Sequence, residues 1–353
     1  MLFSSPKGSS AVKFHSVNPY SISNLRELFP YHQIMTAEDG SAISVQGVTA
    51  FKLLNLYEND IHKCEDFLSI YGAFNAFRVF TYTPVKDWGN EAWDVPKPEV
   101  IHKFIEYMAS KAKYVKLCLL TDDDNHRLNQ AIAIVQDLSK ANYKNVLLEA
   151  GNEPLTHKNI NVDAMYEVLH NSTYLYTSGI YENTKKFYGV FGNDHSARDS
   201  QWPRKAHNLL ECYNGGGPNS PDEPATRVPW CEDEPIKPTE ALNFGSPESV
   251  LKDYYAYAAT CTQFGFGGTF HCESAKYCNL PSDFELECAQ HFLRGLDVFP
   301  ADTALGDYER IDEFGNTLRT YRVGNTLTRI RPVTPVVPSG WTSIDEWGIC
   351  AIR

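Results

Sequence analysis

Residues 145–154, NVLLEAGNEP, join an apolar run of strand length to an Asn-Glu-Pro sequence. A carboxylate at the end of a buried strand is costly to remove from water, so its placement there must bring a benefit. Proton donation to a leaving oxygen is one such benefit, which makes Glu153 a candidate general acid. In the alternative interpretation Glu153 only starts a helix that has Pro154 at its first position. Glu149 shares strand parity with Glu153, and alternation alone does not settle which of them faces a cleft.

A second group of carboxylates lies in VPWCEDEPIKP, residues 228–238. Two carboxylates that face each other across a cleft suit glycoside hydrolysis, in which one protonates the leaving oxygen and the other attacks the anomeric carbon or activates water. Glu232 and Glu234 share strand parity and lie about 6–7 Å apart along a strand, so only one can sit at attack distance. Glu234 is preferred because Pro235 ends the strand directly after it, and Glu232 remains the alternative.

These residues need a scaffold, and short apolar runs of β-branched or aromatic character recur along the chain. The runs cover residues 43–54, 74–82, 114–120, 145–151, 186–192, 206–213, 227–234 and 266–273. Amphipathic stretches separate most of them, although the connections after the fifth and sixth runs are weak as helices. One of those connections contains the loop sequence GGGPNSPDEP.

Eight strands that alternate with helices predict an α/β fold with a parallel sheet, and eight is the number in a closed (β/α)8 TIM barrel. An open doubly wound sheet is the competitor, but no Gly-rich phosphate loop follows the first run. We expect an N-terminal extension over residues 1–42 and the barrel over 43–299. Alternating residues around Gly-Asn turns predict a small β appendage over 300–353.

Active sites of such barrels lie at the C-terminal ends of the strands, so the polar residues that end each run are the candidate site. We expect His271, after the eighth run, to contact substrate. Trp88 and Trp93 lie in the long loop after the second run, and a sugar-stacking role is predicted for Trp88. The run ends supply Arg78, Asn152, Glu153, Asn193, Asp194, His195, Tyr213, Glu234, His271 and Glu273.

The order of these features resembles the clan A glycoside hydrolases, which are retaining (β/α)8-barrel enzymes. That clan has an Arg at the end of strand two, Asn-Glu at the end of strand four and a nucleophilic Glu at the end of strand seven. NAFRVF with Arg78, GNEP with Asn152 and Glu153, and VPWCEDEPIKP occupy the same slots here. The resemblance covers roughly residues 43 to 296.

The resemblance implies a retaining glycosidase that cleaves a β-linked oligo- or polysaccharide by double displacement and requires no cofactor. Glu153 would be the acid/base and Glu234 the nucleophile. Asn152 would hydrogen-bond the sugar 2-hydroxyl, and Arg78 would hold the nucleophile ionised. Tyr213, His271 and Trp88 would contact substrate.

Two other functions stay open. A metal-dependent barrel hydrolase would use His195, Asp194, His271 and Glu273 as ligands, although the paired-His strand-end motif of such enzymes is missing. A glycan-binding barrel without turnover would keep the cleft but release no product. The acidic run TDDDNH is interpreted as a helix start and not as a metal site.

The net charge of -12 argues against nucleic-acid and anionic-membrane partners. We expect neither of these partners, and the resemblance implies a carbohydrate instead. No cysteine or histidine cluster has metal-ligand spacing, so we expect no metal. The N-terminal residues lack the apolar core of a signal peptide. The protein is thus expected to be either secreted or virion-associated with its signal absent from this chain, or cytoplasmic.

Nine cysteines are scattered along the chain without a C-x-x-C pair, which argues against a zinc ribbon or redox motif. Most lie in apolar runs, where Cys behaves as a small hydrophobic residue. Cys272, Cys278 and Cys288 are close enough in sequence to leave a local disulfide open.

Overall fold

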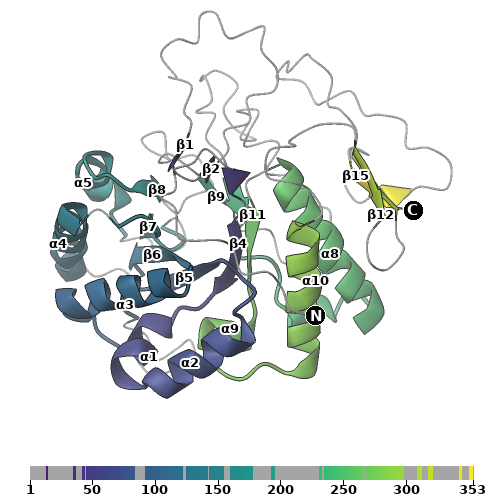
Figure 1. Ribbon diagram of the computed structural model, residues 1–353, viewed down its shortest axis with the longest axis horizontal. Coiled ribbons are helices and arrows are strands. Elements are labelled where there is room, and N and C mark those ends of the chain that lie inside the picture. The colour runs from purple at the N-terminus through teal and green to yellow at the C-terminus, as the bar shows by residue number, and fades with distance from the viewer. Residues whose placement is uncertain are drawn as a thin grey trace, which may run out of the picture.

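A computed structural model describes most of the chain between Val45 and Asp297, together with short strands outside that span (Figure 1). The described residues are 13–14, 35–36, 42–43, 45–83, 92–121, 125–141, 143–154, 160–177, 192–194, 230–232, 234–264, 267–297, 308–311, 317–320, 342–343 and 350–352.

Eight parallel strands form one sheet in the order β8-β7-β6-β5-β4-β11-β10-β9. The strands are β4 Val45–Thr49, β5 Ala76–Phe80, β6 Tyr114–Leu120, β7 Val146–Gly151, β8 Leu175–Thr177, β9 Gly192–Asp194, β10 Trp230–Glu232 and β11 Gly267–Phe270. The first strand, β4, pairs with the last, β11, as in a barrel and unlike a doubly wound sheet. The predicted (β/α)8 barrel fold is confirmed. No pairing of β8 with β9 occurs among the described residues.

The strands could be recognised in the sequence because parallel strands covered on both faces are nearly continuous apolar runs. All five residues of β5 and all six of β7 are buried. In Figure 1, helices α1 to α4 cover one side of the curved sheet, and α8 and α10 cover the other. The helices are α1 Leu53–Asn59, α2 Ile61–Ile70, α3 Pro98–Ser110, α4 Asn125–Ala141, η3 Val162–Met165 (a 3-10 helix), α5 Tyr166–His170, α7 Pro238–Ala241, α8 Pro247–Phe264, α9 Glu273–Lys276 and α10 Asp283–Leu296.

The fifth and sixth strands of the described sheet do not coincide with the runs predicted for them, residues 186–192 and 206–213. The fifth strand is β8, within a stretch expected to be helical, and it pairs Leu147–Glu149 of β7 with Leu175–Thr177. Its sequence, LYT, has the aromatic and β-branched residues that suit a half-buried strand, and pairing with β7 overrides the local helical pattern. The sixth strand is β9, at the end of the run expected to be the fifth. Residues 206–213 lie outside the described part of the chain.

Strands outside the barrel form two antiparallel sheets. An N-terminal sheet joins β1 Lys13–Phe14, β2 Met35–Thr36 and β3 Ala42–Ile43. A C-terminal sheet joins β12 Tyr308–Ile311, β13 Thr317–Thr320, β15 Cys350–Ile352 and β14 Thr342–Ser343 in that order. That these segments form an extension over 1–42 and an appendage over 300–353, separate from a barrel over 43–299, stays a prediction.

All six described side chains of cysteine are free and buried, including Cys272, Cys278 and Cys288. The local disulfide left open by the sequence is therefore not formed. Burial raises the pKa of the Cys272 thiol to about 11, so this group is an inert small hydrophobic residue at neutral pH. Among the described residues no helix is both long enough and apolar enough to cross a membrane.

Candidate active site

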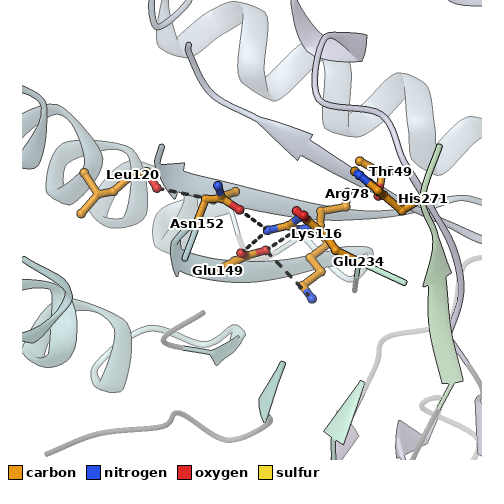
Figure 2. A network of polar contacts seen from close by, with 9 residues as sticks. Thr49, Arg78, Lys116, Leu120, Glu149, Asn152, Glu234 and His271 are labelled. Carbon is orange, nitrogen blue, oxygen red and sulfur yellow. Dashed lines mark hydrogen bonds and ion pairs between the residues drawn. The ribbon is translucent and has the colours of Figure 1, made fainter. Parts of the chain in front are cut away.

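Arg78 is the centre of the polar network at the C-terminal ends of the strands (Figure 2). It lies on β5 and is 1% exposed. Its Nε donates to Glu149 Oε2 at 2.8 Å, and its Nη2 donates to Glu149 Oε1 at 2.6 Å. This bidentate pair matches the planar fork of the guanidinium to both carboxylate oxygens and fixes its orientation.

The remaining donors of Arg78 reach two predicted site residues. Nη1 donates to Glu234 Oε1, and Nη2 donates to Asn152 Oδ1 at 2.8 Å. Figure 2 shows Glu149, Asn152 and Glu234 converging on the guanidinium from β7, the residues after β7 and the residues after β10. The structure thus brings together the polar ends of the second, fourth and seventh strands.

Glu149 and Lys116 belong to this network but were not among the predicted site residues. Glu149 is fully buried, and Lys116 Nζ lies 4.0 Å from its Oε2. Arg78 pairs with Lys116 in the β5–β6 register, and Glu149 pairs with Cys118 in the β6–β7 register. Lys116 and Cys118 are two residues apart on β6, so the side chains of Arg78, Lys116 and Glu149 share one face of the sheet. A charged residue inside each of two apolar runs, YVKLCLL and NVLLEAG, is the sequence signal that could have identified them.

Two stacked rings lie against the guanidinium. The centroids of Phe51 and Phe80 are 3.7 Å apart, and Arg78 Cζ lies 5.4 Å from each centroid. Both rings are buried, so they exclude water from one side of the guanidinium. Charge interactions with Glu149 and Glu234 are screened less in such a site than at the surface.

Glu153 follows the network residue Asn152 directly. The Asn152 backbone N–H donates to the Leu120 carbonyl at 2.8 Å, which continues the sheet bonding one residue past β7. Glu153 is half-buried and has φ of 43°. A left-handed backbone is uncommon for a residue other than glycine, and such strained positions cluster at functional sites. The turn is where the chain leaves the strand direction.

His271 lies at the same edge of the sheet, directly after β11. It is 2% exposed, its Nδ1 is 3.2 Å from Thr49 Oγ1, and its ring centroid is 6.1 Å from that of Phe51. His271 therefore reaches the edge of the aromatic pair that lies against Arg78. Tyr213 and Trp88, the other predicted substrate contacts, lie outside the described residues.

A second charged cluster borders the network after β10 and β11. Lys237 Nζ and Lys276 Nζ each lie 2.8 Å from a carboxylate oxygen of Glu273, and Lys237 Nζ also lies 3.3 Å from Glu240. Burial lowers the pKa of Lys276, while Glu273 and Glu234 act against that shift. Glu273 therefore links the segment after β10, which carries Glu234, to helix α9.

The ligand set of the alternative metal site is not assembled in the described residues. No group of three or more His, Cys, Asp or Glu side chains there is placed to hold a metal ion. Glu273 is engaged by two lysines, and His271 contacts Thr49. His195 lies outside the described residues, and only the backbone of Asp194 is described. Glu232 is the last residue of β10, and its backbone pairs with Asp194 and Gly268.

Comparison with known proteins finds similarity in structure alone. No family model matches the sequence, and no curated protein matches it. A glycoside hydrolase family 5 structure from Bacteroides vulgatus superposes with a TM-score of 0.50 at 13% identity, covering 82% of this chain and 76% of that one. A putative glycoside hydrolase from the same organism gives a TM-score of 0.51 at 12% identity, covering 88% and 67%.

The fold is that of glycoside hydrolase family 5 barrels. The resemblance inferred from the sequence is thereby confirmed for the fold. At this level of identity the likeness extends to the barrel and does not assign individual residues. The roles of Glu153, Glu234 and their neighbours therefore rest on the geometry of this chain.

Proposed function

We propose that the protein is a retaining glycoside hydrolase that cleaves a β-linked oligo- or polysaccharide, with Glu234 as nucleophile and Glu153 as acid/base. The observation that carries the proposal is the Arg78 guanidinium, which donates to both Glu234 and Asn152. Glu234, which is 5% exposed, thereby shares a partner with Asn152, the residue that Glu153 follows directly. The family 5 barrel fold supports the same reaction class.

The reaction would proceed in two displacements. In the first, a Glu234 oxygen bonds to the anomeric carbon while the glycosidic C–O bond breaks, and Glu153 gives its proton to the departing oxygen. In the second, the Glu153 carboxylate takes a proton from water as the water oxygen bonds to the anomeric carbon. The ester bond to Glu234 breaks in the same step, and the sugar leaves with its original configuration.

Arg78 would serve this sequence by keeping Glu234 in the carboxylate form, because an adjacent cation favours the charged state. The ion pair with Glu149 would hold the guanidinium in place, so that its contact with Glu234 is maintained. Asn152 would present its amide to the sugar hydroxyl beside the anomeric carbon while its Oδ1 accepts from Arg78. His271, Tyr213 and Trp88 are proposed as further substrate contacts.

Azide rescue tests the two assignments separately. With a panel of aryl β-glycosides of glucose, mannose and galactose, Glu234→Gly and Glu153→Ala should each lose activity. Azide should restore turnover of Glu234→Gly and give an α-glycosyl azide, because azide then attacks in place of the carboxylate. It should restore Glu153→Ala with a β-glycosyl azide, because azide attacks the glycosyl-enzyme.

Glu232→Gln is the matched control and should retain activity. Loss of activity in Glu232→Gln with full activity in Glu234→Gln would reverse the nucleophile assignment. Release of no product by the unaltered protein from the aryl glycosides and from β-glucan, β-mannan and β-galactan, together with binding to one of these polymers, would instead favour a glycan-binding barrel.

A further inference from the structure

A cavity of about 490 Å³ lies between the segments that follow β4 and β5, and no residue of the Arg78 network lines it. Its walls are helix α1, which follows β4, and residues 92–97, which lead from β5 into α3. Because β4 and β5 are paired neighbours, their following segments lie next to each other. The polar lining includes Lys52, Asn55, Glu58, Trp93, Asp94 and Lys97.

Three polar side chains in this cavity are not engaged within the protein. Asn55 and Glu58 are three residues apart and therefore share a face of α1, and Lys97 stands opposite on the other wall. Among the described residues, the Asn55 amide, the Glu58 carboxylate and the Lys97 ammonium have no side-chain hydrogen bond or ion pair. They provide donors and acceptors to a ligand without first breaking an internal contact.

Trp93 gives the cavity an aromatic wall. Its indole is 8% exposed and clusters with Phe51, Phe80 and Cys118. The backbone is fixed by two hydrogen bonds with Thr83, from Thr83 N to Trp93 O at 3.0 Å and from Trp93 N to Thr83 O at 2.9 Å. Within the described chain the buried Trp93 Nε1–H has no acceptor, which is unusual for a buried indole.

The wall around Trp93 is also held rigid. Arg127 of α4 donates from Nη2 to Asp94 Oδ1 at 2.6 Å, and its guanidinium lies 4.6 Å from the ring centroid of Tyr82. The lining holds two cations, Lys52 and Lys97, and two carboxylates, Glu58 and Asp94, of which Asp94 is already paired with Arg127. A hydroxyl can both donate to a carboxylate such as that of Glu58 and accept from an ammonium such as that of Lys97.

We infer that this cavity is a second carbohydrate-binding site, one that holds a short neutral stretch of glycan outside the catalytic cleft. An aromatic wall, an amide and charged groups that lack protein partners suit the apolar faces and hydroxyls of a sugar, and the volume lies in the range of small-ligand sites. The inference rests on the proposed function only in taking a glycan as the ligand. Such a site raises the residence of the enzyme on a polymer without changing the chemical step.

Affinity gel electrophoresis of the full chain tests the site, with β-glucan, β-mannan or β-galactan cast in the gel. Asn55→Ala and Glu58→Gln should weaken binding to the retarding polymer by roughly three- to tenfold, the change that one lost hydrogen bond produces. Both variants should keep the kcat/KM of the unaltered protein on an aryl β-glycoside. Glu65→Gln, an exposed glutamate on α2, is the matched control and should bind as the unaltered protein does.

Binding and cleavage fail separately in this experiment. The site is supported if a polymer retards the unaltered protein and retards both cavity variants less. This holds even if no product is released and the proposed function fails. Equal retardation of all four proteins overturns the site even if polymer is cleaved. Absence of retardation by every polymer also overturns it.

Discussion

Arg78 and Glu149 form a bidentate ion pair in which neither side chain is exposed to solvent. The pair joins the second and fourth strands of the barrel, and the same guanidinium extends to Glu234 after the seventh. Glu149 thus occupies two donors of Arg78 and leaves the others for Glu234 and Asn152. A structural ion pair and the contact with the proposed nucleophile thus share the Arg78 side chain, and variants of Glu149 and of Arg78 test the two roles separately.

Replacing Glu149 by Gln should destabilise the fold strongly. The change leaves Arg78 and Lys116 buried with one anionic partner fewer, and breaking a buried pair costs about 3–5 kcal/mol. Urea unfolding should therefore show a lower midpoint for Glu149→Gln, with Glu65→Gln at the midpoint of the unaltered protein. A shift of less than about 1 kcal/mol in the free energy of unfolding would place the pair among weak surface contacts.

Replacing Arg78 by Lys should strongly reduce activity. An ammonium keeps the charge but cannot form the fork to Glu149 while also reaching Glu234 and Asn152. We expect kcat/KM on an aryl β-glycoside to fall roughly 100-fold or more, since each 1.4 kcal/mol of lost transition-state stabilisation is tenfold. Arg127→Lys, which alters an Arg whose partner Asp94 is exposed, is the control. Equal activity of the Arg78 and Arg127 variants would contradict a role for the guanidinium geometry.

Much of the barrel could be predicted because its buried strands are short apolar runs. β5, β6 and β7 lie where the sequence places them, and Arg78, Asn152 and Glu234 follow from their positions at run ends. β8 could not be located in this way. It has only three residues, and what makes it a strand is pairing with Leu147–Glu149, a contact between segments that local periodicity does not report.

The inner network was only partly predictable for a related reason. Parity shows that Glu149 shares a face with Glu153 in an ideal strand, but Glu153 has a left-handed backbone after the strand has ended. The residue that faces Arg78 is therefore settled by the turn, not by alternation. The lysine inside the apolar run YVKLCLL singles out Lys116, but this signal alone does not distinguish a buried ion pair from an exposed edge.

Gly267→Ala should prevent stable folding of the barrel closure between β11 and β4. Gly267 has φ of 124°, and a Cβ there would lie 2.0 Å from the Val45 carbonyl oxygen. That contact is with backbone of the paired strand, so neither partner can move without breaking the ladder. Gly245→Ala is the control, because its Cβ would meet the Ser249 hydroxyl, which can rotate away. Thermal unfolding should show a large loss in the first variant and a small one in the second; equal unfolding temperatures would refute the steric argument.

Glu273 should make stability depend on pH in the acidic range. Burial acts to raise the pKa of this carboxyl, but hydrogen bonds from Lys237 and Lys276 outweigh it, so the pKa lies below its usual value of 4.5. A group whose folded pKa is depressed contributes stability that is present above its unfolded pKa and lost as pH falls through the folded pKa. The side chain is 48% exposed, so the contribution is on the order of 1 kcal/mol or less.

The free energy of unfolding of the unaltered protein should therefore exceed that of Glu273→Gln at pH 7, and the difference should shrink below about pH 4.5. Urea unfolding at pH 7, 5 and 4 measures it, with Glu287→Gln, an exposed glutamate on α10, as the matched control. A difference that stays constant across these pH values would mean that Glu273 contributes through packing and not through its charge. Glu273 also ties α9 to the segment that carries Glu234. If that tie positions the proposed nucleophile, Glu273→Gln should lower kcat and leave KM nearly unchanged.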